Sequence, residues 1–324
     1  MFALIIRRLV QLPFILAVIF VLTFTLAWLV PGNPLLQPDR KPPKEVEEAM
    51  KRQYNLDDPW RFAASYLTNL AQGDLGPSLQ YRDQTVNEII GRGLPFSAAI
   101  GFGALLIALM MGVVAGVVGA IRPGSLLDLS SLTMALVGIS LPTFVTGTIL
   151  LVLFATMLDW VSIGGWDWPG WQFWTGGWWQ QAREVLRGIL PPAIALALAP
   201  AAYIARLVRL GLADVMNSDY IRTARAKGVA PGNVLFHHAL KVAFLPVLSF
   251  LGPAAAATMT GSFVVEKIFE IPGLGRDFVS AVVNKDQFLI LGLVLIYSTM
   301  LILFNLLVDI SYAWVDPRID LAEE

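Results

Sequence analysis

Long apolar runs separated by short polar segments dominate the chain. The main apolar stretches without a charged residue cover residues 9–33, 94–121, 129–158, 188–205, 242–265 and 288–308. A helix rises about 1.5 Å per residue, so runs of this length cross a hydrocarbon core of about 30 Å. The pattern predicts an all-α polytopic membrane protein with about six transmembrane helices.

Prolines and small residues mark places where two of these runs depart from a regular helix. Pro142 has no backbone N–H, so the helix loses one hydrogen bond there, and lipid offers no group to replace it. We therefore expect a kink in the third run. Pro253 is expected to break the helix locally in the fifth run, whose surface is rich in small residues. The fifth run is therefore the candidate substrate path, with close helix packing as the alternative. The candidate pore-lining residues are Gly252, Thr258, Gly261 and Ser262.

Residues 31–93 have a more polar composition and predict a small extramembrane segment. The prolines at 42–43 precede a stretch with acids at its start and bases at its end, as a helix favours. Asp58 and Pro59 mark the start of a second helix. Thr85 and Glu88 have the spacing of a capping box before the next apolar run. We interpret the segment as a lid packed on the membrane domain. The apolar face of its second helix comprises Phe62, Tyr66, Leu67 and Leu70.

Tryptophans crowd residues 159–187. Indole rings prefer the headgroup level of a membrane, because the ring is apolar while its N–H requires a partner. An aromatic belt is therefore the expected role, and a platform that stacks sugars or peptides is the alternative. The residues are Trp160, Trp166, Trp168, Trp171, Trp174, Trp178 and Trp179.

The basic segment 218–246 lies between two apolar runs and carries the signals of short helices. Ser218 is a candidate N-cap, Asp219 suits the first turn, and Gly228 suits a left-handed residue that ends the helix. Pro231 then suits the first turn of a second helix. The segment predicts a helix–turn–helix outside the bilayer, with a solvated basic connector as the alternative.

Composition supports the membrane assignment and excludes several classes of site. The 324 residues are 56% hydrophobic and 15% charged, with a mean hydropathy of +0.66. A net charge of −1 gives no sign of nucleic-acid binding, and the chain has no cysteine. The adjacent His237 and His238 point in different directions on a helix, so a metal site is not expected. The sequence also lacks a phosphate-binding glycine loop and a nucleophile elbow, so we expect no ATP hydrolysis by this chain and no cofactor.

Charge asymmetry predicts the orientation in the membrane. The basic residues near short loops gather at the N-terminus, at residues 206–241 and at the C-terminus. By the positive-inside rule, both termini and residues 212–241 are then cytoplasmic, while residues 31–93 and 159–187 lie outside the cytosol. Asp309 lies against the last apolar run near its cytoplasmic end. We expect it to have a structural partner there rather than to relay protons.

Residues 218–246 resemble the cytoplasmic EAA loop of ATP-binding cassette importers. Arg222, Thr223 and Ala224 occupy the EAA positions and Gly228 the glycine, whereas His238 and Lys241 replace an apolar residue and a proline of the general motif. DYIRTARAKG followed by HHALKVAFLP is similar to the version in the oligopeptide/dipeptide permease family. Further similar segments are IIRRLVQLPFIL, PGNP at 31–34, GDLG at 73–76, YIAR at 203–206, FEIPGLGR at 269–276, NLLVD at 305–309 and DPR at 316–318.

This resemblance implies the first membrane subunit of a peptide importer, with a type I ABC importer permease fold in a bacterial inner membrane. It implies a heterodimer with a second homologous permease, two cytosolic ATPases docked on the loops, and an extracytoplasmic substrate-binding protein. The tryptophan-rich insert departs from the family pattern. The implied coupling-loop residues are Asp219, Tyr220, Ile221, Arg222, Thr223, Ala224, Arg225, Lys227 and Gly228.

The resulting hypothesis is a transport subunit, not an enzyme, that forms the path for di- or oligopeptides. A related importer of nickel complexes or sugars, a proton-coupled secondary transporter and a membrane scaffold without transport are the alternatives. The expected organisation is a tail and first helix at 1–30, a lid at 31–93, a permease core at 94–315 containing the coupling loop 212–241, and a cytoplasmic tail at 316–324.

Overall fold

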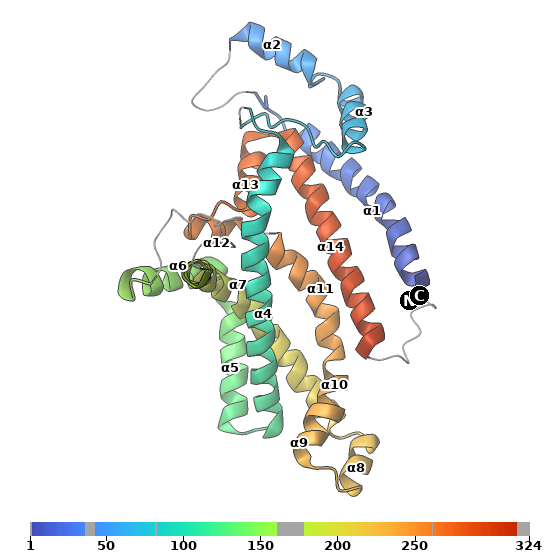
Figure 1. Ribbon diagram of the computed structural model, residues 1–324, viewed down its shortest axis with the longest axis vertical. Coiled ribbons are helices and arrows are strands. Elements are labelled where there is room, and N and C mark those ends of the chain that lie inside the picture. The colour runs from blue at the N-terminus through green and yellow to red at the C-terminus, as the bar shows by residue number, and fades with distance from the viewer. Residues whose placement is uncertain (1, 36–42, 82, 161–177, 261, 316–324) are drawn as a thin grey trace.

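The computed structural model describes residues 2–35, 43–81, 83–160, 178–260 and 262–315, and these residues form helices and connecting loops without a β-strand. Figure 1 shows long helices along one axis of the molecule, with α2 and α3 at one end and α8 and α9 at the other. The long helices are α1 (Phe2–Leu29), α4 (Val86–Ile121), α7 (Trp178–Val215), α11 (Leu245–Met259) and α14 (Gln287–Val315).

Among the described residues, five helical segments are long and apolar enough to cross a membrane, and a bent pair raises the number to six. The bent pair consists of α5 (Leu126–Ser140) and the helix formed by α6 (Thr143–Leu151) with the π-helical η1 (Val152–Met157). Their axes differ by 99°. Pro142 was expected to produce a kink, and the change of direction is confirmed. It is a full interruption because Leu141, the residue before the proline, adopts an extended conformation (φ −77°, ψ 122°).

Helix α4 is the central element and packs closely against α7. A Cβ atom added at Gly112 would lie 2.7 Å from the carbonyl oxygen of Ala201, and one at Gly116 would lie 2.7 Å from that of Ala205. The contact moves four residues along α4, from 112 to 116, as it moves four residues along α7, from 201 to 205. The two helices therefore run in the same direction. Small residues therefore allow the backbones to approach where lipid provides no hydrophobic driving force for association.

The expected break at Pro253 is wrong. Helix α11 continues through Pro253 to Met259, and the next helix, α12, spans Phe263–Ile268. A single proline removes only one helical hydrogen bond, and the surrounding small residues pack tightly enough to keep the helix intact. A Cβ atom at Gly252 would lie 2.5 Å from the side-chain oxygen of Asn305 on α14, which shows how close the neighbouring helix lies.

The segment between α1 and α4 forms two helices, as expected: α2 (Lys44–Gln53) and α3 (Pro59–Leu70). The side chain of Asp58 caps α3 by accepting hydrogen bonds from Trp60 N and Arg61 N. The capping box of Thr85 and Glu88 at the start of α4 is also confirmed. The expected apolar face of α3 is correct except at Leu67, which is exposed because the face turns toward Phe20 of α1.

Aromatic side chains join α3 to α1 and to the start of α14. The rings of Phe62 and Phe288 lie 4.9 Å apart, and those of Tyr66 and Phe20 lie 5.6 Å apart. Phe62 and Tyr66 are both buried. Helix α3 thus packs on α1 and α14, while the role of residues 31–93 as a lid stays a prediction.

Most of the tryptophan-rich insert lies outside the described residues. Of its tryptophans, Trp160 has a described environment, and its ring lies 5.1 Å from that of Phe154 in η1. The aromatic-belt interpretation of residues 159–187 stays a prediction.

Candidate functional site

The segment after α7 folds into a short helix with a well-defined end. Helix α8 spans Asp219–Ala226. Gly228 has a left-handed backbone (φ +79°), as expected from the sequence. Its N–H donates to Arg225 O at 3.0 Å, and the N–H of Val229 donates to Ala224 O at 3.2 Å. These two bonds form a Schellman motif, which sets the direction in which the chain leaves the helix.

The start of α8 differs from the expectation. Ser218 occupies the N-cap position, but its side chain makes no capping bond. The hydroxyl instead donates to Val215 O at 2.6 Å. The backbone N–H of Ser218 donates to the same carbonyl at 3.0 Å. Both bonds fall on a carbonyl at the end of α7, so Ser218 joins the end of one helix to the start of the next.

Two side chains anchor α8 to the rest of the protein. Ile221 is fully buried and Ala224 is nearly so. They join a core that includes Val234 and Ala239 from the second half of the loop and Leu212 from α7. Because one face of the helix is packed in this way, the loop is an ordered element rather than a solvated connector.

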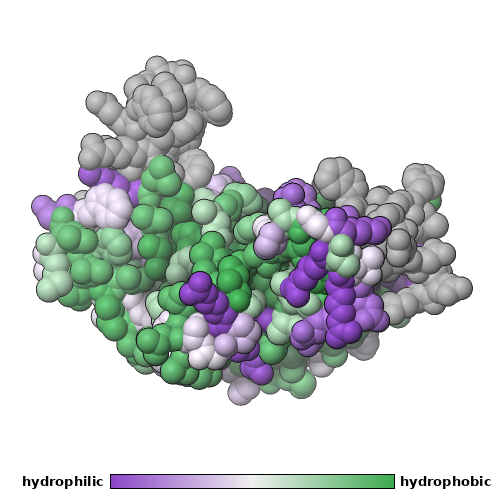
Figure 2. Space-filling view, turned by 90° about the horizontal axis from the view of Figure 1, so that it is seen from below, coloured by the Kyte–Doolittle hydropathy of each residue, from purple (hydrophilic) through white to green (hydrophobic). Residues whose placement is uncertain are grey.

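The opposite face of α8 is exposed and basic. Tyr220 is 45% exposed, and Arg222, Thr223, Arg225, Lys227 and Gly228 are also exposed. Asp219 Oδ1 lies 3.3 Å from Arg222 Nη1. Both side chains are largely in solvent, so this ion pair contributes little to stability. Seen from this end of the molecule, Figure 2 shows hydrophilic residues on the side where α8 and α9 lie and apolar residues over much of the remainder.

The second half of the loop runs through α9 (Pro231–Asn233), the π-helical η3 (Val234–Ala239) and α10 (Leu240–Ala243) to α11. Pro231 is at the start of this helical stretch, as predicted. His237 and His238 are exposed in η3. No group of potential metal ligands occurs among the residues that the structure describes. Through these short helices the loop connects two long helices, α7 before it and α11 after it.

The candidate pore-lining residues are not all in comparable positions. Gly252 contacts α14, as described above. Thr258 is buried, and its hydroxyl donates to Ala254 O in its own helix at 2.9 Å. Ser262 is partly exposed, and Gly261 lies outside the described residues. The contacts of Gly252 and Thr258 are those of closely packed helices, while their role in a substrate path stays a prediction.

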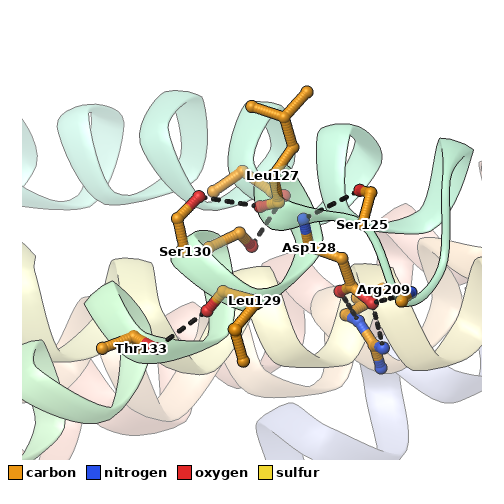
Figure 3. Close-up of polar contacts among 10 residues, drawn as sticks. Ser125, Leu127, Asp128, Leu129, Ser130, Thr133 and Arg209 are labelled. Atoms are coloured by element: carbon orange, nitrogen blue, oxygen red, sulfur yellow. Dashed lines mark hydrogen bonds and ion pairs between the residues drawn. The ribbon is translucent and has the colours of Figure 1, made fainter.

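Two charged residues near membrane helices have partners that the sequence pattern does not identify. Asp309 lies 2.9 Å from Arg8 of α1, which supplies the structural partner expected for it. Asp128 of α5 forms an ion pair with Arg209 of α7, 81 residues later in the chain (Figure 3). The sequence signal for the second pair was an acidic residue, Asp128, just before one apolar run and a basic residue, Arg209, just after another.

Glu266 is a further buried residue that the sequence analysis missed. Only 2% of it is exposed, and it accepts hydrogen bonds from Ser97 Oγ and Arg276 N. It directly follows the fifth apolar run, so an acidic residue next to a predicted membrane helix was the signal that could have identified it.

Comparison with known proteins places these features in a family context. Residues 108–321 match the model of a family described as binding-protein-dependent transport system inner membrane component. The chain is 39% identical to the oligopeptide transport system permease protein OppB of Salmonella typhimurium, over 97% of this chain and 98% of that protein. It is 38% identical to the dipeptide transport system permease protein DppB of Bacillus subtilis, over 98% of this chain and 97% of that protein. A crystal structure of an amino acid ABC transporter with histidines covers 69% of the chain at 18% identity, with a TM-score of 0.48.

Proposed function

From the premise that this multi-pass membrane protein belongs to the binding-protein-dependent transport system inner membrane components, we propose that it is a permease subunit of an ATP-driven peptide importer. The full-length similarity to permeases named for oligopeptides and dipeptides supports peptides as the cargo. A chain with these relatives supplies the membrane path, and separate subunits supply ATP hydrolysis.

The ordered loop 212–241 is the observation that carries the proposal. It presents an exposed basic face on α8 while Ile221 holds the opposite face in the core. Its two ends continue into α7 and α11. Such an element transmits a force from a docked ATPase to the membrane helices, whereas a flexible loop would absorb the movement.

The proposed assembly contains this chain, a second homologous permease, two cytosolic ATPases and an extracytoplasmic substrate-binding protein. Both termini and the loop 212–241 face the cytosol of a bacterial inner membrane. Residues 31–93 face the other side, where the binding protein delivers peptide. The coupling-loop residues face an ATPase, with Tyr220 providing apolar contact and Arg222, Arg225 and Lys227 attracting an acidic groove.

Reconstitution tests the function. The chain is produced with the products of its neighbouring permease, ATPase and binding-protein genes, purified in mild detergent and placed in liposomes. We expect the subunits to copurify. Radiolabelled tri-alanine should enter when ATP is supplied on the side of the loop 212–241 and the binding protein on the side of residues 31–93. Uptake of tri-alanine that follows an imposed proton gradient and ignores ATP would contradict the proposal.

A further inference from the structure

The carboxylate of Asp128 is the centre of a polar cluster that joins α5 to α7. Arg209 Nε lies 2.5 Å from Asp128 Oδ1, and Arg209 Nη2 lies 2.8 Å from Oδ2. Gly124 N also donates to Oδ2 at 2.8 Å, and Ser125 Oγ accepts from Asp128 N at 3.3 Å. Figure 3 shows the guanidinium of Arg209 reaching the start of α5 from α7. The cluster thus ties α7 to the turn between α4 and α5.

This ion pair is geometrically well defined. Only 4% of the Asp128 side chain and 22% of the Arg209 side chain are exposed. A paired contact between a guanidinium and a carboxylate fixes the relative orientation of the two groups as well as their distance. Gly119 of α4 packs beside the pair, since an added Cβ would lie 3.3 Å from Asp128 Oδ1 and 3.4 Å from Arg209 Cδ. Three membrane helices therefore meet at this point.

A second contact between α5 and α7 lies further along both helices. A Cβ atom at Gly138 would lie 3.2 Å from Leu198 O. The two contacts, 128 with 209 and 138 with 198, show that α5 and α7 run antiparallel in close contact. Just beyond Gly138 the chain turns by 99° into α6. There Gly147 faces Ile268 of α12, with an added Cβ 3.2 Å from its Cδ1.

These contacts form a continuous connection that starts at the loop 212–241. Helix α7 ends at Val215, six residues after Arg209, and α8 begins at Asp219. A displacement of the loop therefore moves the end of α7 that carries Arg209. Asp128 is the charged group of α5 that holds this end, while at Gly138 the neighbouring atoms of α7 belong to Leu198 and Ala202.

We propose that Asp128 and Arg209 are a positioning pair for transport: through them, movement of the loop 212–241 is passed from α7 to the α4–α5 hairpin and onward to the bent segment α6. This inference rests on the proposed function, in which that loop receives the ATPase movement. Stability alone does not require the pair, because apolar residues of similar volume often replace a buried ion pair without loss of stability. The oriented contact is what an apolar pair cannot reproduce.

The test compares the complete transporter, reconstituted in liposomes, with two double variants. The first is Asp128→Leu with Arg209→Met, which removes both charges together and so avoids an unpaired buried charge that could prevent folding. The second is the matched control Arg8→Met with Asp309→Leu, which removes another ion pair between two membrane helices, α1 and α14. The measurement is radiolabelled tri-alanine taken up per ATP hydrolysed, together with the amount of assembled complex.

In the Asp128/Arg209 variant we expect assembly at the wild-type level and a fall of about fivefold or more in uptake per ATP, a factor taken from the lower end of the affinity changes between coupled binding sites. The Arg8/Asp309 variant should keep the wild-type ratio. A purely structural role lowers the amount of complex but leaves the ratio unchanged, and that result overturns the inference. The inference is also overturned if both variants lose coupling equally. Absence of ATP-driven uptake by the wild-type complex instead overturns the proposed function, and this inference with it.

Discussion

The hydroxyl of Ser97 in α4 donates a 2.8 Å hydrogen bond to the carboxylate of Glu266 in α12, 169 residues away in the chain. The same hydroxyl oxygen accepts from Leu274 N at 2.9 Å, and Glu266 Oε2 accepts from Arg276 N at 2.9 Å. These N–H groups belong to the first turn of α13 (Leu274–Asn284), which has no partner for them within the helix. Ser97 and Glu266 therefore cap α13 from two other helices.

Replacing Ser97 should destabilise the protein through this cap. Ser97→Ala leaves the buried N–H of Leu274 and one oxygen of Glu266 with fewer partners, at an expected cost of about 1–3 kcal/mol. Ser298→Ala is the matched control, because the Ser298 hydroxyl donates to Val294 O within its own helix. Thermal unfolding of the purified protein in detergent should show a lower midpoint for the first variant alone. Equal midpoints would contradict the capping role.

A side chain at Gly112 should disrupt the contact between α4 and α7. In Gly112→Val the new Cβ meets the backbone of Ala201 at 2.7 Å, so the helices must separate and lose packing. Gly91→Val is the control, since Gly91 lies in the same helix with no atom within 4 Å of an added Cβ. We expect a loss of about 1–3 kcal/mol, the usual cost of overpacking, seen as reduced thermal stability and yield. A stable Gly112→Val protein would show that the helices do not approach this closely.

The left-handed backbone at Gly228 should be needed for coupling. Gly228→Val imposes a strain of about 1 kcal/mol or more because β-branched residues disfavour this conformation. Gly232→Val is the control: neither glycine has an atom within 4 Å of an added Cβ, and only Gly228 has a positive φ. We expect the Gly228 variant to insert and to pair with the second permease, but to bind less ATPase on copurification and to lose ATP-driven uptake. Normal uptake by an equal amount of complex would falsify the role of this turn.

Single cysteines in this cysteine-free chain test the orientation. Asn217 and Asp57 are both exposed and lie at opposite ends of the molecule, beside α8 and α3. With an impermeant thiol reagent, Asp57→Cys should be labelled in intact cells, and Asn217→Cys only after the membrane is permeabilised. The reverse pattern would invert the proposed topology.

A bulky side chain tests whether the fifth membrane segment lines the substrate path. Ser262 is partly exposed, whereas Thr258 is buried among helices. If this segment lines the path, Ser262→Phe should reduce tri-alanine uptake while the amount of assembled complex and the thermal midpoint stay at wild-type values. Thr258→Val is the comparison, because it keeps the shape and removes a hydroxyl that bonds within its own helix. Unchanged uptake in Ser262→Phe leaves close packing as the explanation of these small residues.

Local signals in the sequence were sufficient for much of the structure. The apolar runs predicted the membrane segments, because a helix crossing lipid needs a minimum length of apolar residues whatever its neighbours are. The capping box at Thr85 and the left-handed Gly228 were also predicted, since caps and turns depend on residues within about four positions. The helix and turn of the loop 212–241 were also predicted from its polar pattern, while its coupling role, which its resemblance to a known loop implies, stays a prediction.

Tertiary structure decided which faces of the helices meet. The sequence predicted neither the Asp128–Arg209 pair nor the cap that Ser97 and Glu266 provide for α13, and it misplaced the break expected at Pro253. The reason is physical: helices in lipid are apolar on nearly all sides, so hydrophobic periodicity does not distinguish the face that packs on protein from the face that contacts lipid. Partners 81 and 169 residues apart are therefore chosen by the close packing of small residues and by the need of buried polar groups for one another.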